Sequence, residues 1–224
     1  MNRSVVQALI LKDWRLQRLL VMLSLAAGGI ALAVLQVRCE MAFFLGSTWF
    51  FVSMIVLGCM LPIANVINER KKQNLAFLMS LPVSVLQYAM AKMVSTIGMF
   101  LVSWAAFVVA GATFILSRPD IPNGIIPVML ILAALTLIGF CVVAGAALVS
   151  ESEGCSIAAT IVCNSLYGVA SYFIIFNPAI HGDLKSPVPV WSPIVLTILA
   201  WEIAAIALIL GITFYLQSRK RDFI

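Results

Sequence analysis

Apolar residues dominate six long stretches of the chain, and short polar segments separate them. The first five stretches contain no Asp, Glu, Lys or Arg, and the sixth contains only Glu202. A helix needs about 20 apolar residues to cross a bilayer, and only helices or closed barrels satisfy their backbone groups in lipid. Barrel strands would alternate over about ten residues. The uniform pattern therefore predicts six membrane helices, over residues 19–37, 42–67, 93–116, 124–149, 155–177 and 192–216.

The composition excludes a water-soluble fold. Of the 224 residues, 63% are hydrophobic and 10% are charged, and the mean hydropathy is +1.11. Soluble domains have about 45–50% apolar and about 25% charged residues, and no soluble core of this length hides so much apolar surface. A soluble enzyme, a nucleic-acid-binding domain and a disordered chain are excluded. We expect an all-α polytopic membrane protein with a single transmembrane domain over residues 1–224.

The charges predict the orientation. The net charge is +5, and eleven of the 14 Lys and Arg residues lie before the first stretch, between the second and third, or after the sixth. Arg38, Arg118 and Lys185 lie in the other loops. Short loops rich in Lys and Arg remain in the cytoplasm. Both termini are therefore predicted to be cytoplasmic, in a multi-pass protein that also contacts anionic lipid headgroups.

Residues 2–18 predict an amphipathic helix in the inner interface, ahead of the first membrane helix. At helical spacing, one side gathers apolar residues and the other side gathers basic residues. The apolar set is Val6, Leu9, Ile10, Leu16 and Leu20, and the basic set is Lys12, Arg15 and Arg18. Asp13 falls on the apolar side and does not fit the pattern, so a basic tail without fixed structure remains the alternative. The segment is too long for a cleaved signal peptide.

Residues 68–92 carry more order than a passive connector requires. A short helical pattern ends at Pro82, because the residue before a proline disfavours helix. Ser84 and Gln87 then have the spacing of a capping box, which predicts the start of the next helix. In contrast, the proline-rich loop 178–191 cannot be one continuous helix, and its apolar residues indicate a place in the outer interface.

Catalytic and metal-binding motifs are missing from the sequence. There is one histidine, His181, so two-histidine zinc-protease motifs are excluded, and no glycine precedes a lysine as a P-loop requires. The five cysteines have no metal-type spacing and are interpreted as small buried hydrophobic residues. We expect no cofactor, no metal and no covalent chemistry in this chain.

Glu202 is the one charged residue inside a predicted membrane helix. It lies about 15 Å from Ser192 at 1.5 Å per residue, near the middle of a core about 30 Å thick. A carboxylate there is costly unless it is paired or protonated. One interpretation is a substrate, proton or gating contact. The other is an interhelical hydrogen bond to Asn164, Asn177 or a Ser/Thr hydroxyl.

Three segments resemble ABC-2 type transporter permeases. Residues 68–84, NERKKQNLAFLMSLPVS, resemble the family's signature between the second and third membrane helices. Residues 9–15, LILKDWR, resemble its opening elbow helix, and residues 219–222, RKRD, resemble its basic tail. Six helices with both ends inside match the family along the whole length.

The resemblance implies that residues 68–82 form a cytoplasmic coupling helix that docks on an ATPase subunit. Three features of this segment are implied to act in the coupling: charged residues, an apolar ridge and a bend. The charges are Glu69, Arg70, Lys71 and Lys72, the ridge is Leu75, Leu78 and Met79, and the bend is at Pro82.

The resemblance also implies a function. The chain would be the permease subunit of an exporter in the bacterial cytoplasmic membrane, moving a peptide, antibiotic, lipid or similar substrate. ATP and Mg²⁺ would bind the separate cytoplasmic ABC ATPase, and a second permease subunit, expected to be identical, would complete the pore. The alternatives are an ATP-independent, proton-coupled carrier that uses Glu202, and a membrane enzyme.

The charge bias makes the topology testable. In a background without reactive native cysteines, cysteine at Asp120 or Asp183 should react with an impermeant thiol reagent added to intact cells. Cysteine at Gln73 or Gln217 should react only after the cells are opened. Labelling of position 73 in sealed cells would contradict the orientation.

Overall fold

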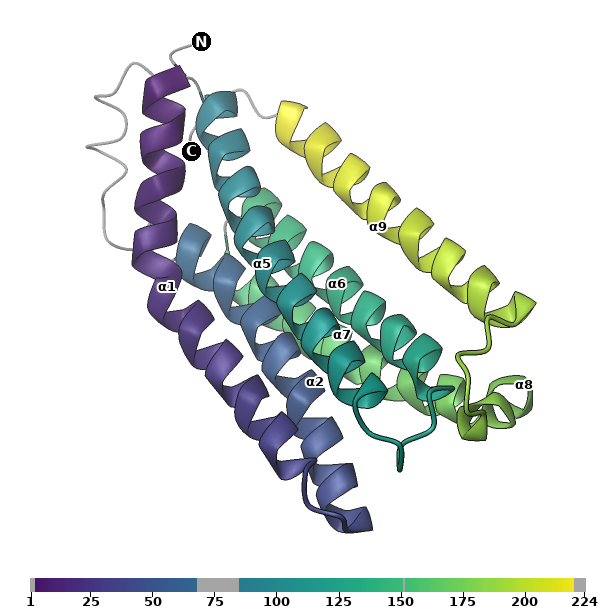
Figure 1. Ribbon diagram of the computed structural model, residues 1–224. Coiled ribbons are helices and arrows are strands. Elements are labelled where there is room, and N and C mark those ends of the chain that lie inside the picture. Colours follow the sequence, from purple (N-terminus) through teal and green to yellow (C-terminus); the bar gives the residue numbers. More distant parts are fainter. Residues whose placement is uncertain (1–2, 68–84, 151, 220–224) are drawn as a thin grey trace.

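A computed structural model describes residues 3–67, 85–150 and 152–219, and these form a helical bundle (Figure 1). No strand occurs among the described residues. The elements are α1 (Arg3–Val34), α2 (Glu40–Pro62), the π-helix η1 (Ile63–Ile67), α5 (Val85–Leu116), α6 (Ile125–Ser150), α7 (Glu153–Ile175), α8 (Pro178–His181), the 3₁₀ turn η2 (Asp183–Lys185) and α9 (Pro193–Arg219).

The prediction of six helices that are long and apolar enough to cross a membrane is confirmed. Six helices of the described chain, α1, α2 with η1, α5, α6, α7 and α9, are long and apolar enough to cross a bilayer. Because six crossings alternate in direction, the start of α1 and the end of α9 lie at one end of the bundle, which we call the terminal end (Figure 1). The connections 35–39, 117–124 and 176–192 lie at the opposite, loop end.

The expected boundary between an interfacial helix over 2–18 and a membrane helix over 19–37 is not present. α1 is a single helix from Arg3 to Val34. No Gly or Pro occurs between residues 3 and 27 to break it. Asp13, the residue that did not fit the amphipathic pattern, is buried against Lys92 of α5. Leu9 of the predicted apolar side is also buried, whereas Leu16 of the same side is 65% exposed.

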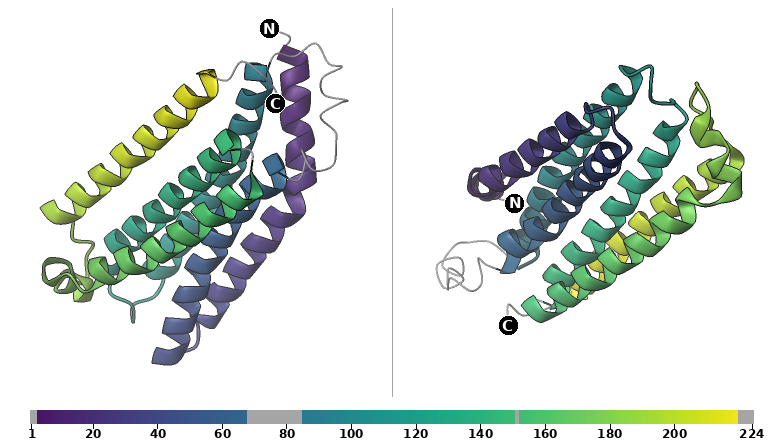
Figure 2. Two further views of the ribbon diagram at one scale, coloured as in Figure 1. Left: turned by 180° about the vertical axis from the view of Figure 1, so that it is seen from behind. Right: turned by 90° about the horizontal axis from the view of Figure 1, so that it is seen from below.

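α6 is the central helix. It packs against α2, α5, α7 and α9, and Figure 2 shows α7 and α9 on the side of α6 away from α1. A helix surrounded by other helices has no polar face, which explains why α6 has the highest hydropathy of the six. On its α5 side, Phe140 stacks on Phe100 with ring centroids 4.0 Å apart, and Gly58 of α2 lies against the Phe100 ring and the Cβ of Phe140. Van der Waals contacts of this kind hold membrane helices together, since lipid removes the hydrophobic difference.

The loop end is tied together by polar contacts. Arg118 pairs with Asp120 at 2.8 Å and donates a hydrogen bond to the side chain of Gln36 at 2.8 Å. The Arg118 hydrogen bond lowers the pKa of Asp120 to about 2, so this carboxylate stays charged above that pH. These contacts join the loop after α1 to the loop after α5.

Residues 178–191 form α8, η2 and an extended segment, and not one continuous helix, as the prolines predict. Ile180 is buried and packs with Val128 and Val195. The turn before α6 fixes the loop from the other side, because the amide of Gly124 donates to Ser186 O at 3.0 Å. A Cβ at Gly124 would meet the carbonyl oxygens of Asp183 and Leu184.

Gly124→Val should therefore destabilise the protein. Backbone carbonyls cannot rotate away as a side chain can, so we expect a loss of about 1–3 kcal/mol and a thermal midpoint several degrees lower. Thermal unfolding in detergent, followed by tryptophan fluorescence, measures it. Gly182→Ala in the same loop is the control, since its Cβ would meet nothing within 4 Å. Equal midpoints for both variants would contradict the packing of this loop on Gly124.

Candidate functional site

The residues predicted to contact an ATPase lie outside the described part of the chain. This applies to Glu69, Arg70, Lys71, Lys72, Leu75, Leu78, Met79 and Pro82. The structure does describe the elements on either side: η1 ends at Ile67 and α5 begins at Val85. Figure 1 shows α5 beginning at the terminal end and α2 with η1 stopping short of it. The start of α5 agrees with the capping-box prediction at Ser84 to Gln87.

A buried polar cluster lies among α1, η1 and α5, close to these two helix ends. The ammonium of Lys92 donates to Oδ1 of Asp13 at 2.8 Å and to Oδ1 of Asn65 at 3.2 Å. The amide of Asn65 in turn donates to Oγ1 of Thr96 at 2.7 Å. All four residues are buried, with relative exposures of 1–3%. We call these four residues the polar cluster.

The local sequence explains how the cluster is built. Pro62 has no N–H to donate within α2 and its ring crowds the preceding turn, and the chain continues from it as the π-helix η1. Single π turns are often found at functional sites. η1 carries Asn65, while Lys92 and Thr96, four residues apart, share one face of α5. The cluster can therefore hold three helices in one arrangement at the terminal end.

The charge pattern counted Lys92 with the cytoplasmic segment between the second and third apolar stretches, but its side chain is buried in the bundle. It lies within the continuous helix α5 and is 3% exposed. One local sign of the burial of Lys92 was present in the sequence. Asp13 on an apolar helix face needs a buried cation, and Lys92 follows a helix start at residue 85 and precedes an apolar run.

Glu202 lies on the side of α9 that faces α6, and it is 5% exposed. It is the tenth residue of α9, about 14 Å along the helix from Pro193 at 1.5 Å per residue. Val195 and Thr213 are the other buried residues of α9. Thr213 lies against Gly145, so α6 and α9 approach closely here.

Neither carboxylate oxygen of Glu202 has a hydrogen-bond partner among the described residues. The interhelical hydrogen bond of the second interpretation, to Asn164, Asn177 or a Ser/Thr hydroxyl, is therefore not formed. The side chain of Asn177 caps α8 by accepting from the amide of Ala179. Asn164 lies on α7 and lines a small cavity together with Cys59 of α2. Glu202 is therefore a buried carboxyl group that the helix packing does not satisfy.

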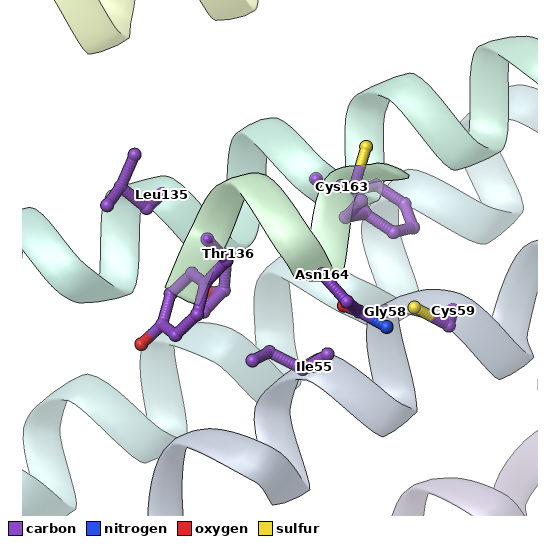
Figure 3. A pocket seen from close by; sticks show the side chains of 10 residues that line it. Ile55, Gly58, Cys59, Leu135, Thr136, Cys163 and Asn164 are labelled. Atoms are coloured by element: carbon purple, nitrogen blue, oxygen red, sulfur yellow. The ribbon is translucent and has the colours of Figure 1, made fainter. Parts of the chain in front are cut away.

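A small cavity lies between α2, α6 and α7 (Figure 3). Its volume is about 20 Å³, which is room for about one water molecule. Polar groups reach it from all three helices: Cys59 from α2, Thr136 from α6, and Cys163, Asn164 and Tyr167 from α7. In this arrangement it is too small for an organic substrate, and it can hold a water that bridges these groups.

Within the described ranges, no group of three or more His, Cys, Asp or Glu residues could hold a metal ion. All five cysteines are free thiols. Among the described residues, the buried charged side chains lie at the polar cluster and at Glu202.

Comparison of the chain with protein-family models, with curated proteins and with solved structures finds no match.

Proposed function

We propose that the protein is the membrane subunit of an ATP-driven exporter in the bacterial cytoplasmic membrane, with both termini in the cytoplasm. The observation that carries the proposal is the sequence of residues 68–84, which resembles the ATPase-coupling segment of ABC-2 type permeases. Six helices long enough to span a membrane support it. The position of η1 and α5 also supports it, since η1 ends toward the terminal end and α5 begins there.

The mechanism transmits motion and involves no covalent chemistry in this chain. ATP-driven closure of two partner ATPase subunits displaces residues 68–82, which lie between η1 and α5 in the sequence. The polar cluster ties η1 and α5 to α1, so the three helices move together. A second permease subunit, identical in the simplest assembly, faces the first, and their joint movement alternates access for a peptide, antibiotic, lipid or similar substrate.

One observation favours a second candidate function. Glu202 is buried near the middle of α9 with both oxygens lacking a hydrogen-bond partner among the described residues. Intramembrane carboxyl groups are typical of proton relays in carriers. An ATP-independent, proton-coupled carrier would need no ATPase and would lose transport in Glu202→Gln. A P-loop ATPase encoded by a neighbouring gene and purified with the protein in mild detergent would favour the exporter.

The decisive variant for the exporter is Leu78→Asp. We expect it to abolish association with the ATPase, because a charge in an apolar docking groove is costly. Membrane insertion should be unchanged, since position 78 lies outside the six spanning helices. Co-purification of the ATPase measures the effect, and Leu78→Met, which keeps the apolar volume, is the control.

Charge removal tests the same contact independently. Arg70→Ala with Lys71→Ala should weaken the complex, and the loss should be largest at low ionic strength, where the wild-type contact is least screened. A stoichiometric ATPase complex with normal transport in Leu78→Asp would show that the coupling assignment is wrong.

A further inference from the structure

α9 is a membrane helix at the edge of the bundle (Figure 1). It packs mainly on α6, with small contacts to α5 and α8. Much of the rest of its surface is exposed, including Trp201, which is 73% exposed, and Ile203, at 66%. The α6–α9 interface therefore decides whether α9 stays with the bundle.

Apolar contacts enclose Glu202 from both directions along α9. Toward the loop end, Val195 packs with Val128 and Ile131 of α6. Toward the terminal end, Ile206 packs against the core cluster that contains Phe100 and Phe140. Between these contacts the carboxyl group has no hydrogen-bond partner among residues 3–67, 85–150 and 152–219. The packed interface thus shields Glu202 from water.

No charge on the helices around α9 balances a carboxylate at this position. Cys141 is the only titratable residue of α6, and it is buried in the core cluster that contains Phe100 and Phe140. α5 contains Tyr88 and Lys92 near its terminal end, and Lys92 is bonded to Asp13 and Asn65. α8 contains His181, at the loop end. On α9 itself, Tyr215 and Arg219 lie about 20 Å or more from Glu202 along the axis.

The physical consequence is a link between charge and packing. An ionised carboxylate in an apolar interface costs several kcal/mol unless a cation or water satisfies it. A neutral carboxyl group costs much less. The packed interface therefore accommodates the protonated form, and the ionised form requires that α9 move away from α6 far enough to admit water.

We propose that Glu202 is a proton-binding site that couples the packing of α9 on α6 to pH. Proton binding favours the packed arrangement, and proton release favours the separated one. A hydrated glutamic acid titrates near pH 4.3. Between that pH and the pH at which Glu202 ionises in the packed form, each rise of one pH unit increases the ratio of separated to packed protein about tenfold.

A distance measurement tests this without reference to transport. Ser150 of α6 and Ser218 of α9 are exposed and lie at the terminal ends of their helices. Spin labels at S150C and S218C, with the five native cysteines replaced by alanine, report the separation by pulsed EPR in lipid nanodiscs. Labelled protein is diluted into excess unlabelled protein, so that only distances within one chain contribute. We expect the longer-distance fraction to increase severalfold between pH 5.5 and pH 8.5.

Three variants make the result specific to Glu202. Glu202→Gln cannot ionise and should give the short distance at both pH values. Glu202→Met should give the same result, and it replaces Glu202→Gln if the buried amide lowers the yield of folded protein. Glu40→Gln removes an exposed carboxyl group at the loop end and should retain the wild-type pH response. Gly145→Leu places a side chain against Thr213 and should give the long distance at both pH values.

The outcomes separate clearly. A wild-type distance distribution that does not change from pH 5.5 to pH 8.5 would overturn the proposal. So would a pH response that persists in Glu202→Gln, because another group would then be titrating. A short distance in Gly145→Leu would show that the α6–α9 contact is not the one described, which also overturns it. None of these results depends on whether the protein binds an ATPase.

Discussion

The buried contact between Asp13 and Lys92 organises the terminal end of the bundle. Two opposite charges at 1% and 3% exposure are tolerated only where each is matched by the other and by further hydrogen bonds. Asn65 supplies one of these bonds and is itself held by Thr96. This requirement explains why α1 continues without a break through residues 3–34, since an interfacial helix turned away from the bundle would remove Asp13 from Lys92.

Glu202 shows the opposite solution to the same problem. Asp13 and Glu202 are both buried carboxyl groups on helices that pack against the bundle. Asp13 has an ammonium at 2.8 Å, so its charge is compatible with a fixed arrangement of three helices. Glu202 has no hydrogen-bond partner in the described part of the chain. The packed arrangement therefore accommodates Glu202 only in its neutral, protonated form. One end of the bundle is thereby fixed by an ion pair, while the edge helix α9 is left responsive to a proton.

The sequence predicted the number and type of the helices because uniform apolarity over more than 20 residues has one structural solution in lipid. It also located Glu202, since a single carboxylate in an apolar run is conspicuous. It did not predict the continuity of α1, the π turn after Pro62 or the burial of Lys92. Each of these depends on which residues from distant segments meet, and periodicity within one helix carries no information about that. The misfit of Asp13 was the one local sign, and its meaning required the position of Lys92.

The arrangement of the helices also separates two kinds of movement. α6 contacts four other helices and has no polar face, so it provides a fixed reference for both sides of the bundle. On one side, α1, η1 and α5 are joined by the polar cluster, and a force applied at Ile67 or Val85 acts on all three together. On the other side, α9 is held chiefly through α6, and its contact includes a close approach at Gly145 and an unsatisfied carboxyl group at Glu202. Because α9 packs mainly on α6 and has only small contacts with α5, α9 can separate from α6 without breaking the ion pair between Asp13 and Lys92.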